Sequence, residues 1–242
     1  MIVLEDPAFE REVFRQGSPI AVPAELRLDG EGNLRILAFS MAVPACEAFE
    51  ARYGKDPLSP AALGRLIDAL TPLMAEYGYD ECDTESYPLL EYRPEGVSGV
   101  PESSPAVLIG TLDGERWDES LPLDEFALDP ADPVDRMAVV RDGDGRIVCF
   151  AGLNDISEDE GLCELNAECA EGYRGRGYGP ACVALLAAYL DELGRGCQYL
   201  TSHLNRPSVR CAEKAGLSLH ARIFPVVFRK SGEDDAEFFD FT

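Results

Sequence analysis

The sequence has few of the side chains that build metal centres or basic surfaces. It contains only two histidines, His203 and His220, and none of its eight cysteines belongs to a Cys-x-x-Cys pair. Structural zinc sites usually combine such pairs with histidines at fixed spacing, so we expect no metal site. Basic residues are also scarce, with 21 Lys and Arg against 45 Asp and Glu, which gives a formal net charge of −24.

The excess of acidic residues bears on possible partners. It repels the phosphates of nucleic acids and anionic membrane surfaces, and it attracts cations. We therefore expect neither a nucleic-acid nor a membrane partner. An acidic surface also simply keeps a protein soluble, and this second explanation stays open.

Long apolar segments are missing as well. No run reaches the roughly 20 residues that a membrane-spanning helix needs. The stretch from Met1 to Asp6 has no basic region followed by an apolar core, so it does not look like a secretory signal, and we expect a cytoplasmic protein. Most cysteines lie inside apolar patterns, where free cysteine behaves as a small core residue.

The second half of the chain has the more regular pattern. Asp142-Gly143-Asp144-Gly145 separates two apolar runs and predicts a hairpin. Strands are expected over residues 137–140, 147–153, 162–169, 198–202 and 223–228, and helices over residues 181–193 and 207–215. This order predicts a mixed α/β (α+β) fold. We expect a domain over residues 131–242 and an N-terminal region of unclear fold, a candidate acceptor-side domain, over residues 1–130.

The first half gives fewer indications. A helix is expected from Asp6 to Gly17, and a clearer one from Ser59 to Gly78, where leucines recur at helical spacing. Residues 34–40, 89–92 and 106–112 are expected as strands. The acidic tail from Gly232 to Thr242 is either a docking strand or a frayed end. Trp117 and Tyr87 either line an acceptor pocket or pack in the core.

The most informative segment runs from Glu168 to Pro180, where a strand is followed by a turn rich in glycine and arginine and then by an apolar helix. Glycine lets backbone N–H groups approach a ligand, and a helix N-terminus carries partial positive charge, so the segment predicts a phosphate site. It is not a dinucleotide fingerprint, because Pro180 or Cys182 occupies the last glycine position. It is not a P-loop either, since the required lysine is absent.

The turn, Arg174-Gly175-Arg176-Gly177-Tyr178-Gly179, resembles the [RQ]-x-x-G-x-[GA] signature of the GNAT superfamily of acyl-CoA-dependent N-acetyltransferases. Asn205-Arg206-Pro207-Ser208, followed by a short helix ending near Gly216-Leu217, is similar to a later segment of that family. The resemblance covers about residues 134–228. It implies a mixed central sheet flanked by helices, here with an elaborated N-terminal half.

The resemblance also implies roles for single residues. Acetyl-CoA would be the co-substrate, with its pyrophosphate on the backbone of the turn and its pantetheine arm on Asn205. A backbone N–H near Cys169 would polarise the thioester carbonyl. The cofactor-binding residues expected on this basis are Cys169, Arg174, Gly175, Arg176, Gly177, Tyr178, Gly179, Asn205 and Ser208.

Acetyl transfer by direct attack requires a neutral amine. A lysine-like amine has a pKa of about 10.4, so keeping it neutral at pH 7 costs about 4–5 kcal/mol, and a general base is expected. Glu164, Asn166 and Glu168 alternate along one predicted strand and share a face. Glu164 and Glu168 are the candidate bases, with a solvated strand face as the alternative.

One position departs from the family pattern. A tyrosine that serves as the general acid often follows the Asn by seven residues, and here that position is Ala212. Tyr173, Tyr178 or Tyr199 would have to replace it, or the thiol, with a pKa near 8.5, leaves without a dedicated acid.

Three functions therefore stand side by side. The first is transfer of an acetyl group to a primary amine of a small molecule or of a basic peptide or protein. The second is a catalytically inactive GNAT-like domain that binds CoA or another protein. The third is docking of a basic partner to the acidic first half. The oligomeric state is not predicted.

Overall fold

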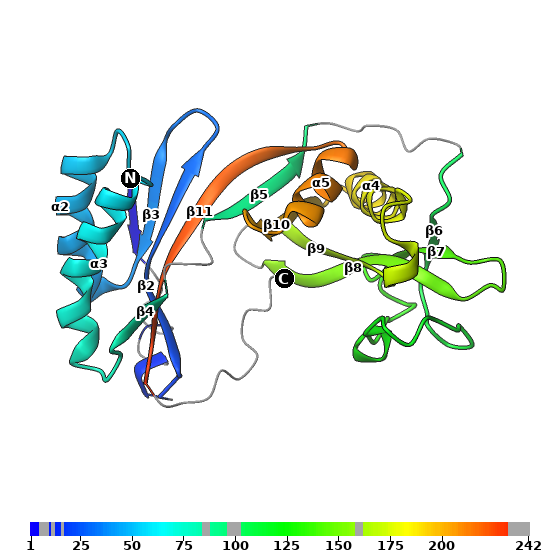
Figure 1. Ribbon diagram of the computed structural model, residues 1–242, viewed down its shortest axis with the longest axis horizontal. Helices are drawn as coiled ribbons and strands as arrows, with labels where there is room; N and C mark the ends of the chain where they lie inside the picture. The colour runs from blue at the N-terminus through cyan, green and yellow to red at the C-terminus, as the bar shows by residue number, and fades with distance from the viewer. Residues whose placement is uncertain are drawn as a thin grey trace. The chain divides into compact units, whose positions relative to one another are not determined.

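The structure, a computed structural model (Figure 1), describes residues 1–4, 10, 13–15, 17–83, 88–95, 103–157 and 162–231, without the side chains of residues 155–157. Most of the first expected helix, Tyr87 and the tail from Gly232 to Thr242 lie outside the described residues. The chain divides into two compact units. The first comprises Met1–Leu90, Ser202–Asn205 and the residues from His220 onwards, and the second comprises Glu91–Thr201 and Arg206–Leu219. The division predicted at residue 130 stays a prediction.

The first unit is built on a mixed sheet. Its order is β1-β3-β2-β11, with β4 also paired to β11. Only β1 and β3 run parallel, and the other pairs are antiparallel. The strands are β1 (Ile2–Leu4), β2 (Ile20–Asp29), β3 (Leu34–Ala38), β4 (Glu81–Asp83) and β11 (Leu217–Arg229), the last contributing Ala221–Arg229 to the pairing with β2.

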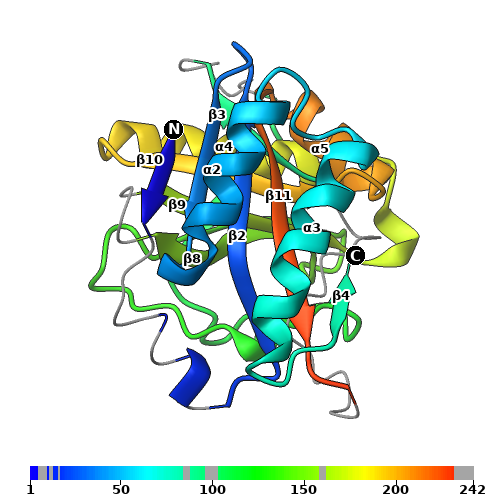
Figure 2. The same ribbon diagram turned by 90° about the vertical axis from the view of Figure 1, so that its left-hand side faces the viewer.

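Two helices, α2 (Val43–Tyr53) and α3 (Pro60–Ala75), cover one face of this sheet, as Figure 2 shows, and the short 3-10 helix η1 (Ser40–Ala42) precedes them. The expected helical spacing in α3 is confirmed: Leu66, Leu70 and Met74 follow one another at intervals of four and are all buried. Leu26 of β2 and Ile36 of β3 are completely buried as well.

The second unit contains the mixed sheet that the second half of the sequence predicts. Its order is β5-β10-β9-β8-β7-β6, in which β9 and β10 are parallel and the pairs from β9 to β6 are antiparallel. The strands are β5 (Leu89–Pro94, of which this unit takes Glu91 onwards), β6 (Val107–Ile109), β7 (Met137–Arg141), β8 (Ile147–Ser157), β9 (Leu162–Cys169) and β10 (Gly196–Ser202).

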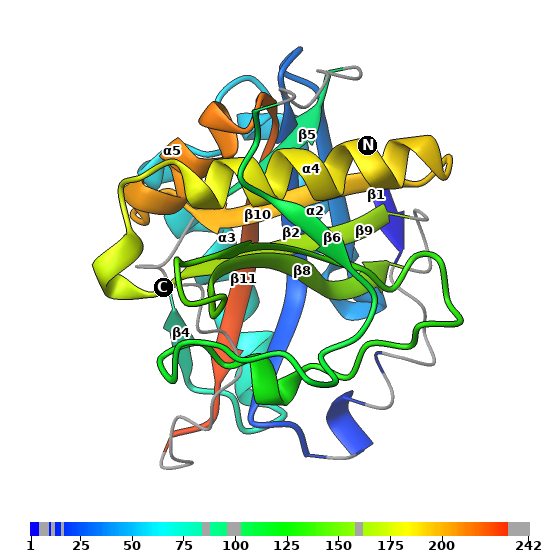
Figure 3. The same ribbon diagram turned by 90° about the vertical axis from the view of Figure 1, so that its right-hand side faces the viewer.

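Helix α4 (Tyr178–Glu192) connects the parallel strands β9 and β10 and lies across the sheet (Figure 3). It buries Cys182, Val183, Leu186 and Leu190 against β7, β8 and β9. A shorter helix, α5 (Arg206–Lys214), packs beside α4, and the 3-10 helices η2 (Leu123–Glu125) and η3 (Glu171–Tyr173) lie in connections. The mixed α/β class is thus confirmed.

None of the described helices is both long and apolar enough to cross a membrane.

The cysteines depart from the expectation in one place. Cys149 of β8 and Cys169 of β9 are joined by a disulfide, so for these two the interpretation as free core residues is wrong. The pair is directly opposed in the strand register, which brings the two side chains onto the same face. Of the remaining cysteines, Cys46, Cys163, Cys182 and Cys197 are buried and Cys82 and Cys211 are half-buried.

Helix α3 provides a test of the core of the first unit. Leu66 is 1% exposed, so Leu66→Ala should lower the free energy of unfolding by about 2–5 kcal/mol. Arg65 precedes it with a side chain 71% exposed, and Arg65→Ala should change that energy by no more than about 0.5 kcal/mol. Urea unfolding measures both, and equal effects would contradict the assigned buried face.

Candidate functional site

The candidate site lies where β9 ends and α4 begins. Ala170 closes the strand with an N–H that donates to the carbonyl oxygen of Val148, at 2.9 Å. The chain then makes the 3-10 turn η3 and an exposed loop, residues 174–177, before α4 starts at Tyr178.

Three glycines shape this loop for two different reasons. Gly175 and Gly177 have φ angles of +78° and +83°, in the left-handed region that favours glycine. Gly179 instead has little room for a side chain, because a Cβ there would lie 3.2 Å from Sγ of Cys211, which would have to shift. A Cβ at Gly177 would meet none of the described atoms within 4 Å, so the backbone conformation is the constraint at this position.

This conformation leaves a run of backbone donors without protein partners. None of the N–H groups of residues 175–179 donates a hydrogen bond to another described residue. The next N–H in the helix that has a partner is that of Ala181, which donates to the carbonyl oxygen of Gly177, because Pro180 has no N–H. Five exposed or half-exposed donors at a helix N-terminus form an anion-binding arrangement.

The two arginines of the turn hold the loop in shape. Arg174 donates from Nε to the carbonyl oxygen of Cys169 at 3.0 Å, which ties the loop to the end of β9. Arg176 donates from Nη2 to the carbonyl oxygen of Gly172 at 2.9 Å, and its guanidinium lies 4.9 Å from the centre of the Tyr173 ring. Both guanidinium groups stay at the loop and add positive charge beside the free N–H groups.

Asp142 of the β7–β8 hairpin supports η3 from the other side. Its Oδ2 accepts from the hydroxyl of Tyr173 at 3.2 Å and from Nη2 of Arg146 at 3.0 Å, while its Oδ1 accepts from the backbone N–H groups of Asp144 and Arg146. The backbone N–H of Arg146 and then its guanidinium hold the pKa of Asp142 below its usual value. The ionised carboxylate is therefore the form that braces the turn.

The cysteines around the start of α4 form a cluster. The disulfide partner Cys169 has its Sγ 3.7 Å from the Cβ position of Gly179, on the same side as Sγ of Cys211. Sγ of Cys182 lies 3.9 Å from the carbonyl oxygen of Cys149. Burial raises the pKa of the Cys211 thiol to about 11 and that of the Cys182 thiol to about 12, so both are protonated at neutral pH.

The candidate bases Glu164 and Glu168 lie on the face of β9 opposite to the one that carries Cys169. Glu168 is paired in register with Phe150, whose ring packs at 5.3 Å from that of Phe126. Phe150 belongs to a buried cluster with Leu121, Leu123 and Met137, on the face away from α4. Glu164 lies four residues before Glu168 in the strand and therefore shares this face. Both glutamates are half-buried.

The second predicted segment divides between the two units. Ser208 of α5 exchanges a hydrogen bond with the hydroxyl of Tyr199 at 2.9 Å, and burial raises the pKa of Tyr199 to about 12. Asn205 immediately precedes α5, and its N–H donates to the carbonyl oxygen of Ser202. Ala212 is completely buried in α5. The structure thus brings Cys169, the turn and Ser208 into one unit and assigns Asn205 to the other.

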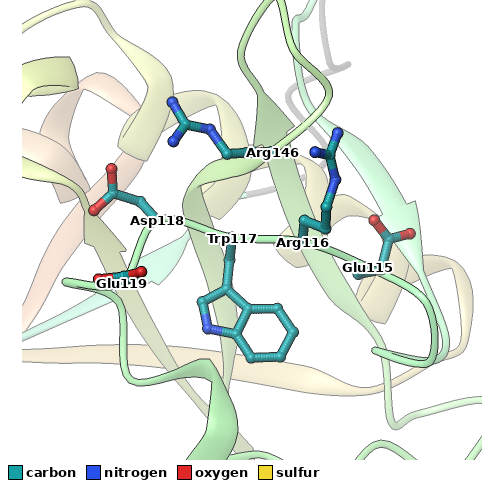
Figure 4. A pocket seen from close by; sticks show the side chains of 6 residues that line it. All are labelled: Glu115, Arg116, Trp117, Asp118, Glu119 and Arg146. Carbon is teal, nitrogen blue, oxygen red and sulfur yellow. The ribbon is translucent and has the colours of Figure 1, made fainter.

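A pocket of about 640 Å³ lies beside the hairpin and is lined by Glu115, Arg116, Trp117, Asp118, Glu119 and Arg146. Figure 4 shows the guanidinium groups of Arg116 and Arg146 on one side of this segment and the indole of Trp117 on the other. Trp117 also packs against the cluster that contains Phe150, so it both lines a pocket and contributes to a core. The pocket connects to the turn through Arg146, Asp142 and Tyr173.

The histidines take no part in this site. His203 contacts the carbonyl oxygen of Pro88 through both its N–H and its ring Nδ1, at 3.2 and 3.1 Å, which is a structural role. Within the described ranges, no group of three or more His, Cys, Asp or Glu side chains is arranged to hold a metal ion.

Comparison with protein families assigns the segment that contains the turn. Residues 115–218 match the family model described as Acetyltransferase (GNAT) domain. This match confirms the resemblance carried by Arg174–Gly179, and the matched segment covers most of the second unit.

Several solved structures are similar to this chain. A GNAT-family protein from Novosphingobium aromaticivorans is 22% identical, with 60% of this chain and 65% of that chain covered and a TM-score of 0.42. An acetyltransferase from Colwellia psychrerythraea is 11% identical, with 86% and 81% covered and a TM-score of 0.47. A GCN5-related N-acetyltransferase from Kribbella flavida is 18% identical, with 72% and 76% covered and a TM-score of 0.45. This chain therefore spans slightly less than two thirds of the Novosphingobium protein. No curated protein matches the chain.

Two features of the site were not predicted from the sequence. Asp142 was interpreted only as a hairpin residue, and nothing in the sequence links it to Tyr173. The Cys149–Cys169 pair depends on the register of β8 and β9, because the expected strands 147–153 and 162–169 do not by themselves fix which residues are opposed.

The turn allows a test of its backbone conformation. Gly177→Ala should lower the free energy of unfolding by about 1–2 kcal/mol, because an L-residue is disfavoured at a φ of +83°. Gly172, five residues earlier, has open space at its Cβ position and no positive φ, so Gly172→Ala should leave stability unchanged or raise it by up to about 1 kcal/mol. Thermal unfolding measures the stability of both variants. If Gly177→Ala left the stability unchanged, the assigned left-handed conformation of Gly177 would be contradicted.

Proposed function

We propose that the protein is an N-acetyltransferase that moves an acetyl group from acetyl-CoA to a primary amine of its acceptor by direct attack. The observation that carries the proposal is that none of the N–H groups of residues 175–179, at the start of α4 and within the segment that matches the GNAT family, donates to another described residue. These donors, together with Arg174 and Arg176, suit the pyrophosphate of CoA.

The end of β9 would hold the reacting group. In this proposal the backbone N–H near Cys169 polarises the thioester carbonyl and stabilises the oxyanion that forms when the amine attacks. Ser208, which lies in the same unit as the turn, is proposed to bind the same co-substrate, and the contact of Asn205 with the pantetheine arm stays a prediction from the resemblance. The support for these assignments is their place in the chain relative to the turn, since Cys169 is hydrogen-bonded to Arg174 and α5 begins directly after Asn205.

Glu168 is the stronger candidate for the general base. It adjoins Cys169, where the thioester is proposed to lie, whereas Glu164 is four residues further back, about 13 Å along a strand. Glu168 also shares its face of the sheet with Phe150 and the cluster that reaches Trp117, and an acceptor on that face would approach the thioester from the side away from α4.

Departure of the thiol would not need a dedicated acid. Ala212 offers no hydroxyl, the hydroxyl of Tyr173 donates to Asp142, and Tyr199 is buried with its pKa raised to about 12. A thiol with a pKa near 8.5 is a good enough leaving group to depart as thiolate and be protonated by water.

The class of acceptor is inferred from the net charge of the chain. A chain with a net charge of −24 favours a cationic amine, either a small molecule or a basic peptide or protein. An acceptor-side region over residues 1–130, a catalytic region over residues 131–242 and a cytoplasmic location are parts of the same proposal.

One observation favours a second candidate. Because Ala212 is fully buried where the family often has its acid, the domain would also suit a protein that binds CoA without turning it over. The two functions differ in turnover and agree in CoA binding.

The proposed reaction is tested by incubating the protein with acetyl-CoA and a panel of primary amines that includes polyamines and basic peptides, with free thiol as the readout. We expect thiol release above the background rate with at least one cationic amine. CoA binding by calorimetry without release would select the binding module instead, and absence of binding would reject both functions.

The assignment of the base has its own test. Glu168→Gln should lower kcat by about 10²–10⁴-fold, since a carboxamide cannot accept the proton, with CoA affinity unchanged. Glu164→Gln is the matched control on the same face and should retain most of the activity. If Glu164→Gln lost activity while Glu168→Gln stayed active, Glu164 would be the base and the assignment of Glu168 would be wrong.

A further inference from the structure

The disulfide between Cys149 and Cys169 lies at the strand end that supports the turn. Cys149 is completely buried in β8, and Cys169 is half-buried at the last position of β9. The carbonyl oxygen of Cys169 accepts the Nε of Arg174, so the residue that forms the disulfide also anchors the first arginine of the turn.

The sulfur of Cys169 reaches the start of α4 as well. It lies 3.7 Å from the position that a Cβ would take at Gly179, the last of the five residues with free N–H groups. One cysteine therefore lies at both ends of the turn, with its carbonyl oxygen hydrogen-bonded to Arg174 and its sulfur beside the Cβ position of Gly179.

Two further thiols surround the pair without joining it. Sγ of Cys211 is 3.2 Å from the same Cβ position, so it lies no more than about 7 Å from Sγ of Cys169, and Cys182 contacts the carbonyl oxygen of Cys149. Because burial keeps both thiols protonated, they are poor nucleophiles toward the neighbouring disulfide. The pair can thus be reduced and reformed without exchange into the cluster.

We propose that Cys149 and Cys169 form a reversible dithiol–disulfide site that sets the affinity of the turn for CoA, with the disulfide as the high-affinity form. The inference rests on the proposed function, because it concerns the same CoA site. The disulfide ties the end of β9 to β8 and so fixes the carbonyl oxygen that holds Arg174. A ligand that binds a fixed turn loses less conformational freedom than one that must order it.

The chemistry is ordinary thiol–disulfide exchange with a low-molecular-weight thiol. In reduction, an external thiolate attacks Sγ of the half-buried Cys169, forms a mixed disulfide there and releases Cys149 as the thiolate, which takes a proton. A second external thiolate then attacks the sulfur of the external thiol, releases Cys169 and leaves as the external disulfide. Oxidation is the reverse: a small-molecule disulfide accepts two electrons and becomes two thiols.

The proposal is tested by calorimetric titration of CoA into two samples of the full chain, one treated with oxidised glutathione and one with a dithiol reductant that is then removed. Alkylation and peptide mass mapping identify which cysteines are paired in each sample. We expect Cys149 paired with Cys169 only in the oxidised sample, and CoA bound at least about fivefold more tightly there, at the lower end of usual coupling between sites.

Two variants separate the pair from its surroundings. Cys149→Ala leaves Cys169 in place but removes the disulfide, so both treatments should give the affinity of the reduced protein. Cys211→Ala is the matched control, since it removes a neighbouring thiol and keeps the pair, and its response to oxidation should persist. Circular dichroism of each variant establishes that it is folded.

The outcomes are distinct. Equal affinity in the oxidised and reduced samples, or a linkage between Cys169 and Cys211 in place of Cys149 and Cys169, overturns the proposed switch and leaves the proposed function intact. Absence of CoA binding in both samples overturns the function and the switch together.

Discussion

The conformation of five backbone units, residues 175–179, is the constraint on which the site depends. Gly175 and Gly177 in the left-handed region turn the chain from β9 into α4 and leave successive N–H groups without a partner among the described residues. Buried side chains elsewhere fix where this turn lies: α4 is held by its apolar face on the sheet, and Gly179 is pressed against the cysteine cluster. The helix N-terminus then supplies the field that an anion needs.

The turn is braced at three points, all within the second unit. Arg174 connects it to the end of β9, Tyr173 connects η3 to Asp142, and the Cys149–Cys169 disulfide joins the two strands beneath it. Each of these contacts uses a residue that the sequence alone would suggest either for ligand binding or for core packing. The arginines of the signature thus have a structural task in the protein alone, and in the proposed CoA site the phosphate would be bound by the backbone and attracted by their charge.

The sequence predicts the second unit well because its signals are local. Glycines and the Asp-Gly hairpin punctuate apolar runs, and β7, β9 and α5 end within a residue or two of their expected bounds. The first unit is less predictable: Pro23 weakens the strand pattern of β2, and α2 buries only Cys46 and Phe49, so its apolar spacing is weak and both elements were missed. The contacts of Asp142 with Tyr173 and of Cys149 with Cys169 depend on strand register, which no local pattern reports. The identity of the acceptor depends on a surface with no sequence signature.

The central claim, that CoA binds through the backbone at the start of α4, is tested most directly by amide chemical shifts. In an assigned ¹H–¹⁵N spectrum, titration with CoA should shift the amide signals of Gly175, Arg176, Gly177, Tyr178 and Gly179 most strongly, since these are the free donors. Adenosine, which lacks the pyrophosphate, should leave them in place. Binding of CoA with these five signals unmoved, and the largest changes elsewhere in the chain, would contradict the account.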